Sequence, residues 1–441
     1  MDYNAQDKQI HIVNLAVCAS LQAFEEYSSR SLNCRRDVIA AIRVKLRPYL
    51  QEIAEREYAE TCMGNVRDKI IKLVLALDKT PGVEDLLSEV VTGDHGMTLH
   101  EQAPYGVVLA IYPATNPCAT MINNVISMLA AGNSVISIPN PRCMETSQFL
   151  TEKINEAIEE ACGIQNLVVT LPESRNDLLT EIINHPDVAL VVATGGRKMM
   201  SHVLCSPKRV IAGGPANPVA IVDETADLAK AAKDISDGAS FDNNIMCISE
   251  KCIVAVESIV PAFVKQLEEN GVYYIDNETE MLQVTKTVLN HDMKMVRKME
   301  GKSAMDILEE AGIHPNRPVR LVVVRTFAKH PLVLEECLMP VVPLVAVADF
   351  EEALETALFT EQGYRHTAMV HSQCIDRLSK AAKIMNTTVF IKNGSSLAGI
   401  GLNGEEMASF TIANVTGEGI TTARDFACKR SCTLTSGFSL R

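Results

Sequence analysis

Short apolar runs alternate with helix-like segments through most of the chain, and this alternation constrains the fold more than any other feature. The first block contains five strand-like runs, at 106–113, 134–139, 166–172, 187–196 and 208–214. They are apolar at successive positions, which is typical of strands buried on both faces of a parallel sheet. A second block from Pro218 to 393 repeats the pattern. The sequence therefore predicts an α/β fold with two parallel-sheet domains.

The domain boundaries are expected where this alternation of strand-like and helix-like segments starts, breaks or ends. The first 75 residues read as helical, and a short β element is expected near 97–106. The Gly213-Gly214-Pro215 break separates the two blocks, which predicts one domain over 1–213 and another over 214–424. The polar tail 425–441 reads as a strand that pairs either with the 97–102 stretch or with another subunit.

Composition narrows the class of protein. The formal net charge of −14, from 55 acidic and 41 basic residues, argues against a nucleic-acid partner. No apolar run reaches the ~18–20 residues of a membrane span, and the opening MDYNAQDKQI does not resemble a signal peptide. The thirteen cysteines form no CxxC pair and read as reduced thiols. A cytoplasmic protein without a metal site is expected.

Cys247 stands apart from the other cysteines because it lies in the polar junction FDNNIMCISEK, between an expected helix and an expected strand. Asp242, Asn243 and Asn244 precede it, and amide side chains can donate hydrogen bonds to a thiolate or an oxyanion. A thiol at such a junction is a candidate nucleophile. From the residues alone, a structural cysteine remains the alternative.

The junction resembles the nucleophile segment of the CoA-acylating aldehyde dehydrogenases. Further stretches resemble the same family in the same order, among them ETCMGNVRDKI (60–70), EQAPYGVVLAIYPATNPCATMINNVISMLAAGNSVI (101–136), GGPANPVAIVDETADL (213–228), GYRHTAMVHS (363–372) and SFTIANVTGEGITTARDF (409–426). The propionaldehyde and acetaldehyde dehydrogenases of bacterial microcompartments are similar, as is the aldehyde dehydrogenase half of bifunctional aldehyde–alcohol dehydrogenases.

The resemblance implies an aldehyde dehydrogenase-like fold and a reversible reaction of a short-chain aldehyde, CoA and NAD to acyl-CoA and NADH. It implies that residues 1–213 form a Rossmann-type cofactor domain, 214–424 the catalytic domain and 425–441 an oligomerisation strand. Cys247 would form a thiohemiacetal and then a thioester, and Asn116 would donate to the thiohemiacetal oxygen. His366 would take or give the thiol proton, with a core histidine as the alternative; an ordinary imidazole has a pKa of ~6.5.

The resemblance also places the cofactor. Ile138, Pro139 and Asn140 match an adenosine-binding turn, while Thr194, Gly195 and Gly196 end a strand and open a helix, as a pyrophosphate site requires. Pro340 matches a proline turn near the nicotinamide. Arg197 and Lys198 either hold phosphates or form a solvated helix face. NAD is expected on family grounds, and NADP is not excluded.

Three further residues, Thr411, Gly417 and Gly419, are expected at the acyl or CoA end. Ala212 lies where hydrolytic relatives carry the glutamate that activates water, so a thioester at Cys247 should wait for a thiol. A glutamate introduced at Ala212 is accordingly expected to face the thioester.

The resemblance implies a homodimer or tetramer, and co-packaging with microcompartment enzymes is compatible with it although no encapsulation helix is recognisable. Two alternatives stay open. One is a phosphate-linked semialdehyde reductase of the same superfamily; the other is a non-catalytic scaffold or cargo protein with this fold.

Overall fold

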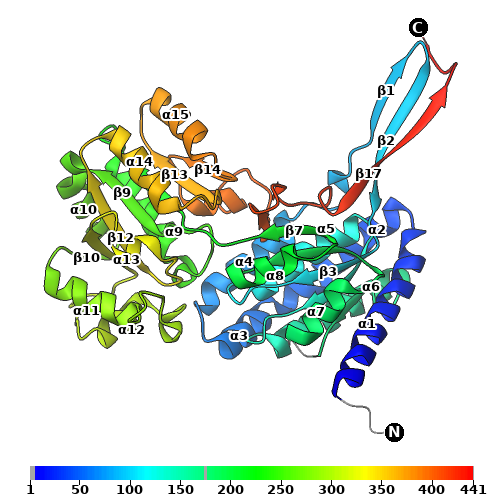
Figure 1. The fold of residues 1–441 in the computed structure, drawn as a ribbon, viewed down its shortest axis with the longest axis horizontal. Coiled ribbons are helices and arrows are strands. Elements are labelled where there is room, and N and C mark those ends of the chain that lie inside the picture. Colours follow the sequence, from blue (N-terminus) through cyan, green and yellow to red (C-terminus); the bar gives the residue numbers. More distant parts are fainter. Residues whose placement is uncertain (1–4, 173–175, 441) are drawn as a thin grey trace. The chain divides into compact units, whose positions relative to one another are not determined.

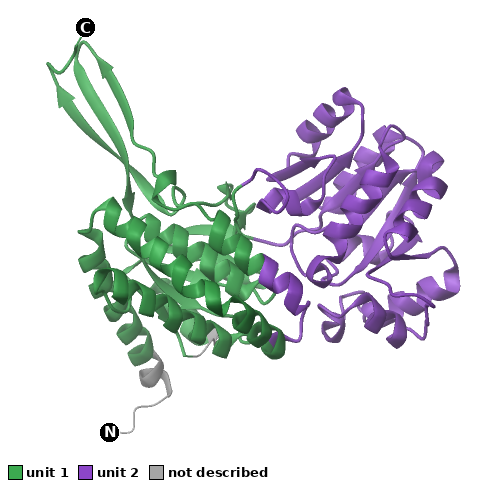
Figure 2. Ribbon diagram, turned by 180° about the vertical axis from the view of Figure 1, so that it is seen from behind, with its two compact units in different colours: residues 1–60, 72–213, 407–441 green, residues 61–71, 214–406 purple. Residues whose placement is uncertain are grey.

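The structure is a computed structural model that describes residues 5–172 and 176–440, and these form two compact units. Unit 1 contains the described residues of 1–60, 72–213 and 407–441, and unit 2 contains 61–71 and 214–406 (Figure 2). Two segments lie in a different unit from the one that the predicted domains of 1–213 and 214–424 would give them. Residues 61–71 belong to unit 2, because their hydrogen bonds run to Asp242 and Asn243, and residues 407–424 belong to unit 1.

Unit 1 is built on a five-stranded parallel sheet in the order β5-β4-β3-β6-β7. Its strands are β3 (Val107–Ile111), β4 (Ser134–Ile138), β5 (Val168–Thr170), β6 (Val188–Thr194) and β7 (Arg209–Gly213). Its helices are α1 (Ala5–Ser28), α2 (Leu32–Leu46), α3 (Leu50–Thr61), α4 (Val66–Lys79), α5 (Pro117–Ala130), α6 (Met144–Cys162), α7 (Asn176–Asn184) and α8 (Arg197–Leu204). The ends of α3 and α4 extend into the segment assigned to unit 2.

Both faces of this sheet are covered by helices, as its apolar strands require (Figure 1). One face packs against apolar side chains of α1, α7 and α8, including Val17, Ile182 and Val203. Helix α5, all of whose residues are buried, contacts β4 and α2. Helix α6 ends where Gly163 adopts φ 75°, a left-handed conformation that glycine tolerates without steric cost.

A three-stranded antiparallel sheet extends from unit 1 (Figure 1). Strand β2 (Gly96–Pro104) lies between β1 (Glu89–Gly93) and β17 (Ala427–Thr435). The tail therefore pairs with the 97–102 stretch of its own chain, one of the two predicted alternatives. Strand β1 is exposed at every position, so it lacked the apolar alternation that would have predicted it.

Asn133 joins the C-terminal segment to the core of unit 1. This residue is completely buried, and its side-chain oxygen accepts hydrogen bonds from the backbone of Tyr105 (2.8 Å) and Gly106 (3.1 Å). Its side-chain nitrogen donates to the carbonyls of Met128 (3.2 Å) and Phe426 (2.8 Å). One carboxamide thereby connects the start of β3, the end of α5 and the start of β17.

Unit 2 is built on a seven-stranded parallel sheet in the order β10-β11-β12-β9-β8-β13-β14. Its strands are β8 (Val219–Val222), β9 (Cys252–Val256), β10 (Val272–Ile275), β11 (Leu321–Thr326), β12 (Val341–Val347), β13 (Thr367–His371) and β14 (Val389–Lys392). Its helices are α9 (Leu228–Ser240), α10 (Val260–Glu269), α11 (Glu278–Val288), α12 (Ala304–Glu310), α13 (Pro331–Leu334), α14 (Phe350–Glu361) and α15 (Ile375–Met385). The α/β fold with two parallel sheets is confirmed, although β10 was not predicted.

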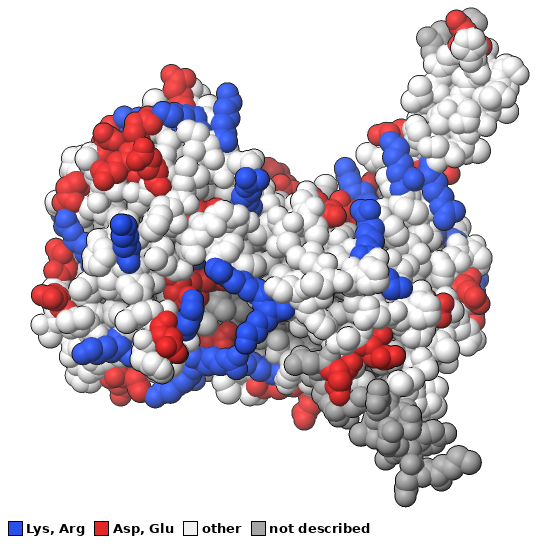
Figure 3. Space-filling model, in the orientation of Figure 1, with Lys and Arg blue, Asp and Glu red and all other residues white. Residues whose placement is uncertain are grey.

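The surface has a mixed charge. Acidic and basic side chains lie intermixed on the face shown in Figure 3, and several pair along one helix, as Lys230 does with Asp234 and Lys233 with Asp237. None of the helices in the described ranges combines the length and the apolar character needed to cross a bilayer. Within the same ranges no disulfide joins any cysteines.

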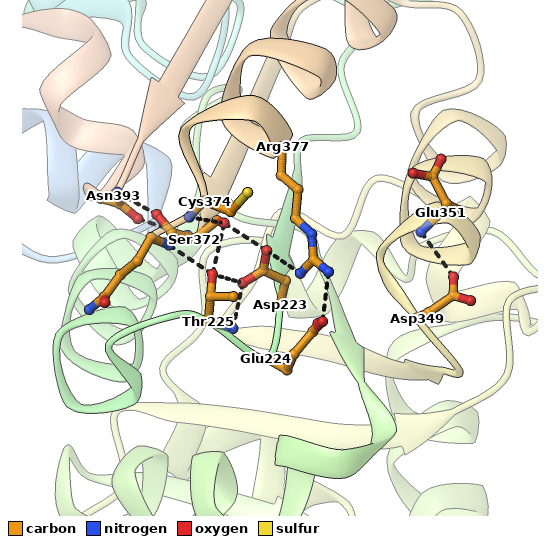
Figure 4. A network of polar contacts seen from close by, with 10 residues as sticks. Asp223, Glu224, Thr225, Asp349, Glu351, Ser372, Cys374, Arg377 and Asn393 are labelled. Atoms are coloured by element: carbon orange, nitrogen blue, oxygen red, sulfur yellow. Dashed lines mark hydrogen bonds and ion pairs between the residues drawn. The ribbon is translucent and has the colours of Figure 1, made fainter.

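The buried carboxylate of Asp223 links the carboxyl ends of the adjacent strands β8 and β13 in unit 2 (Figure 4). Asp223, which follows β8, accepts hydrogen bonds from Ser372 Oγ (2.6 Å) and from Thr225 N (2.8 Å) and Oγ1 (2.6 Å). Arg377 Nη1 adds a charged hydrogen bond of 3.0 Å. Burial alone would raise the pKa of Asp223, but these hydrogen bonds outweigh it and hold the pKa below its ordinary value.

We predict that Asp223→Asn lowers the free energy of unfolding by about 2–3 kcal/mol at pH 7, because charged hydrogen bonds are lost inside the protein. A depressed folded pKa stabilises the protein above the ordinary carboxyl range, so the deficit should shrink as pH falls below ~4. Urea unfolding at several pH values measures this. The control Glu224→Gln removes an exposed partner of the same arginine and should cost less than about 1 kcal/mol. Equal stability of Asp223→Asn and wild type at pH 7 would show that the negative charge of Asp223 does not stabilise the fold.

Candidate active site

Cys247 lies on a tight turn that leads into β9. The Ser249 N–H donates to the Met246 carbonyl (3.2 Å), which closes the turn around Cys247 and Ile248. The Cys247 side chain is partly exposed, whereas Cys252, five residues later, is completely buried within β9. Of these two thiols, only Cys247 is therefore accessible to a substrate.

The electrostatic surroundings of Cys247 oppose ionisation overall. Burial of the sulfur raises the pKa of the thiol to about 12, and the Glu336 carboxylate also raises it. The Lys251 ammonium and the backbone N–H groups of Cys247 and Ile248 act in the other direction. The thiolate needed for nucleophilic attack therefore depends on the few groups that favour the negative charge.

His366 is completely enclosed at the start of β13. Its ring Nδ1 lies 2.8 Å from Thr367 Oγ1, and its backbone N–H donates to Glu361 (3.3 Å). Burial lowers the pKa of the imidazole to about 4, well below the expected value near ~6.5, so the ring is neutral at pH 7. A neutral ring can still accept a proton, and its assignment to thiol proton transfer stays a prediction.

Three of the predicted residues lie at one edge of the unit 2 sheet. Strands β12, β9, β8 and β13 are adjacent and parallel, and Leu344, Ile253, Ala220 and Met369 stand level across them. Cys247 precedes β9, while Pro340 and His366 immediately precede β12 and β13. Since parallel strands begin at the same edge, the fold gathers the loops that carry these residues.

Asn116, the segment 138–140 and the segment 194–196 lie at or just after the carboxyl ends of strands in the sheet of unit 1. Asn116 comes after β3 and begins α5, but its side chain does not cap that helix within the described part of the chain. Instead, Lys72 Nζ donates to Asn116 Oδ1 at 2.6 Å. An ammonium can only donate, so the oxygen must face Lys72 and the amide nitrogen is turned away from it. Lys72 was not among the predicted site residues, because its sequence context is that of an ordinary helical lysine. It is nevertheless almost completely buried.

The turn after β6 suits a dinucleotide. Thr194 ends the strand, and Gly196 begins α8 without a capping side chain among the described residues. A Cβ added at Gly196 would meet only open space, so a ligand can approach the backbone there. Uncapped N–H groups at a helix N-terminus bind pyrophosphate, which fits a nicotinamide dinucleotide. Arg197 and Lys198 lie in the exposed first turn of α8.

The turn after β4, which is predicted to bind adenosine, is held by hydrogen bonds within it. Asn140 Oδ1 accepts the backbone N–H of Arg142 (3.1 Å), and the Asn140 carbonyl accepts that of Cys143 (2.9 Å). Ile138 is buried and its carbonyl accepts the Tyr112 N–H (3.1 Å). The segment 138–140 is therefore held in a defined conformation beside the other strand ends of unit 1.

Thr411, which is expected at the acyl or CoA end, packs within unit 1. Its hydroxyl lies 3.0 Å from Thr194 Oγ1 and 3.1 Å from Asn124 Oδ1, next to the dinucleotide turn. Gly417 and Gly419 have φ values of 95° and 83° in the turn between β15 (Ile412–Ala413) and β16 (Gly419–Ile420). These glycines permit a turn that side-chain-bearing residues disfavour.

The expectation that a glutamate at Ala212 would face a thioester is wrong. Ala212 is completely buried in an apolar cluster with Ala193 and Met200, so a carboxylate introduced there would enter the core. Strand β7 itself, RVIAG, contains no acidic residue on either face. Thr416 Oγ1 accepts the Ala212 N–H (2.9 Å) and donates to Glu418, and the Glu418 carboxylate lies 3.9 Å from Arg209 at the start of β7.

Comparison with known proteins places the chain in a family. The model of the aldehyde dehydrogenase family matches residues 3–402. The chain belongs to the aldehyde dehydrogenase family. It is 45% identical over 431 residues to the propanal dehydrogenase (CoA-propanoylating) of Salmonella typhimurium, covering 97% of this chain and 92% of that enzyme. It is 40% identical over 430 residues to the acetylating acetaldehyde dehydrogenase EutE of the same organism, covering 96% and 92%.

Solved structures agree with this assignment. A propionaldehyde dehydrogenase from Rhodopseudomonas palustris with bound propionyl-CoA superposes with a TM-score of 0.95 at 39% identity, covering 97% of this chain and 95% of that one. A propionaldehyde dehydrogenase from a fucose utilisation bacterial microcompartment of Clostridium phytofermentans also has a TM-score of 0.95, at 39% identity and 97% and 98% coverage. The predicted family and the aldehyde dehydrogenase-like fold are confirmed.

We predict that Asn116→Ala lowers kcat for aldehyde oxidation by ~10²–10³, the usual loss for one oxyanion donor. Lys72→Met should lower kcat by ~10–10², because the amide loses the contact that orients it. Steady-state NADH formation measures both. The control Lys79→Met changes an exposed lysine of the same helix and should leave kcat unchanged. Normal turnover by Lys72→Met would show that Asn116 is oriented by other contacts.

Proposed function

We propose that this chain is a CoA-acylating aldehyde dehydrogenase that converts a short-chain aldehyde, CoA and NAD to acyl-CoA and NADH, reversibly. Its similarity to enzymes named for this reaction, at 40–45% identity over almost the full chain, carries the proposal. A related structure is described with bound CoA and an acylated cysteine. The lack of an acidic residue in β7 agrees with transfer to a thiol rather than to water.

Cys247 is the proposed nucleophile. Its thiolate attacks the aldehyde carbonyl carbon and forms a thiohemiacetal, whose negative oxygen receives hydrogen bonds from the Asn116 amide and the Cys247 backbone N–H. Loss of hydride from the same carbon leaves a thioester on Cys247. The CoA thiol then attacks this thioester, the acyl–Cys247 bond breaks, and the Cys247 thiolate is restored. His366 accepts the CoA thiol proton in this scheme.

A bound nicotinamide dinucleotide would supply the hydride acceptor. The residues proposed to hold it are Ile138–Asn140, Thr194–Gly196 and Pro340. The open backbone at Gly196 and the uncapped start of α8 support this placement. NADP remains an alternative to NAD, since a related engineered glycolyl-CoA reductase structure contains NADP⁺.

Assembly and location are part of the proposal. We propose a homodimer or tetramer that uses the β1-β2-β17 sheet, because β1 leaves a sheet edge with Val90 and Val91 exposed. We also propose that the protein works in the cytoplasm or together with microcompartment enzymes. The relative from the Clostridium phytofermentans microcompartment supports the second setting.

We predict that Cys247→Ala abolishes acyl-CoA formation, whereas Cys252→Ala keeps most of the activity because that thiol is buried in β9. Acyl-CoA and the acylated peptide are measured by mass spectrometry after incubation with an aldehyde panel, NAD and CoA. Thermal unfolding checks that both variants fold. The nucleophile assignment fails if Cys252→Ala is the inactive variant.

We further predict that omission of CoA limits the wild-type enzyme to a burst of at most one NADH per active site. The acyl-enzyme then persists because β7 offers no carboxylate to activate water. Stopped-flow absorbance at the NADH band measures the burst, and later addition of CoA should restore steady turnover. Rapid production of free carboxylic acid without CoA would overturn the acylating assignment.

A further inference from the structure

The loop that carries Cys247 is closed at its base by three hydrogen bonds. Lys251 Nζ donates to the Asn244 carbonyl (2.5 Å) and to Asn244 Oδ1. Asn244 Nδ2 donates back to the Glu250 carbonyl (3.0 Å). Residues 244 and 250–251 are thus fixed to each other, and Cys247 lies midway between them.

The backbone before this loop adopts a conformation that requires external support. Asp242, Asn243 and Asn244 have φ values of 45°, 55° and 60°, three consecutive left-handed residues with side chains. Residues with side chains seldom adopt this conformation, although aspartate and asparagine tolerate it best, and three in a row are unusual. Neighbouring groups hold the turn: Asp242 accepts the Asn65 N–H (2.7 Å) and lies 3.5 Å from Lys69 Nζ. Strained backbone that is held by its surroundings is typical of functional sites.

The base of the loop is also anchored to the rest of unit 2. The Glu250 carboxylate accepts hydrogen bonds from the backbone N–H (2.9 Å) and the hydroxyl (2.8 Å) of Ser396. The Lys251 N–H donates to the Pro218 carbonyl (2.9 Å), at the start of β8. The amine of Lys251 is therefore built into a fixed frame and is almost completely buried.

The ionisable groups around this amine are Cys247, Glu250, Glu336 and Cys337. Burial lowers the pKa of Lys251 and these four groups raise it; burial outweighs them, and the resulting pKa is about 8. Burial raises the pKa of Glu250 to about 7. The Lys251 ammonium lowers the pKa of the Cys247 thiol, against burial and against the Glu336 carboxylate.

We infer that Lys251 is the positioning residue of the nucleophile: it closes the Cys247 loop through Asn244, and the same positive charge stabilises the Cys247 thiolate. This inference rests on the proposed role of Cys247. One side chain thereby supplies both the geometry and the charge that a reactive cysteine needs. Charge of this kind favours the thiolate most strongly where water is excluded.

The test measures the reactivity of Cys247 without any substrate. Iodoacetamide alkylates the thiolate, and peptide mass spectrometry follows labelling at Cys247 across pH 6–10. Lys251→Gln keeps a donor for Asn244 but removes the charge. At pH 7 we expect its labelling to be about tenfold slower, which corresponds to a thiol pKa about one unit higher. The difference from the wild type should disappear well above pH 8, because wild-type Lys251 then loses its own charge. Lys251→Arg keeps the charge and should stay near the wild-type profile, as should Lys265→Gln, which changes an exposed lysine of α10.

Turnover provides a second readout. For Lys251→Gln, we expect kcat to fall about tenfold at pH 7 and to recover as pH rises, while KM for CoA stays within about twofold. A purely structural role would give a loss that higher pH does not repair. If Lys251→Gln does not fold, Asn244→Asp retains the acceptor and sets a carboxylate against the ammonium, and it should shift the labelling profile in the same direction.

Two outcomes would overturn the inference. One is an unchanged Cys247 labelling profile in a folded Lys251→Gln or Asn244→Asp variant. The other is an equal loss in Lys251→Gln and Lys251→Arg that does not depend on pH. Failure of the wild type to form acyl-CoA would instead reject the proposed function, since the labelling experiment needs neither aldehyde nor CoA.

Discussion

Parallel strand pairing is the constraint on which both units depend. Parallel strands need crossover connections, so every strand of a sheet starts at one edge and ends at the other. In unit 2 this brings the loops before β9, β12 and β13 to one edge, with Cys247, Pro340 and His366 among their residues. In unit 1 the turns after β3, β4 and β6 share the opposite kind of edge, where strands end. These candidate site residues lie at strand ends because the strands themselves are buried on both faces.

Three buried lysines contact polar side chains in or beside the segments that carry the candidate site residues. Lys72 fixes the amide of Asn116, Lys251 fixes Asn244, and Lys69 lies against Asp242. Removing an ammonium from water is costly unless hydrogen bonds and opposite charge compensate it. In each case the partner is an amide or carboxylate oxygen on a segment beside a proposed catalytic residue. The cation defines the orientation of its partner because it can only donate.

The sequence predicted the strands that are buried at every position, such as β3, β4, β8 and β9, because their residues are mostly apolar at successive positions. It failed for β1, which is exposed, and for β10, where two tyrosines are only half-buried. The polar junction around Cys247 marked it as a candidate nucleophile, and the resemblance added Asn116. It could not supply Lys72 or Lys251, because lysines are usually solvated and nothing local marks these two as buried.

Other differences arise from burial and from the direction of side chains. The low pKa of His366 follows from complete enclosure, which a sequence does not reveal. The orientation of Ala212 follows from the alternation of neighbouring residues along β7, and it was predictable only once the strand register was known. Residues 61–71 and 407–424 each belong to the unit that their position in the sequence did not predict. For 61–71 the cause is long-range hydrogen bonding, such as that from Asn65 to Asp242.

The discontinuity of unit 1 has a consequence for biosynthesis. A ribosome completes all of 214–406 before the segment that supplies β17 and Phe426 leaves the exit tunnel. Throughout that interval β2 has a neighbour on only one side, and the Asn133 amide lacks one of its acceptors. Unit 2 needs from the N-terminal part only residues 61–71, which are synthesised earlier. Vectorial synthesis therefore lets unit 2 complete its fold while unit 1 still waits for its last segment.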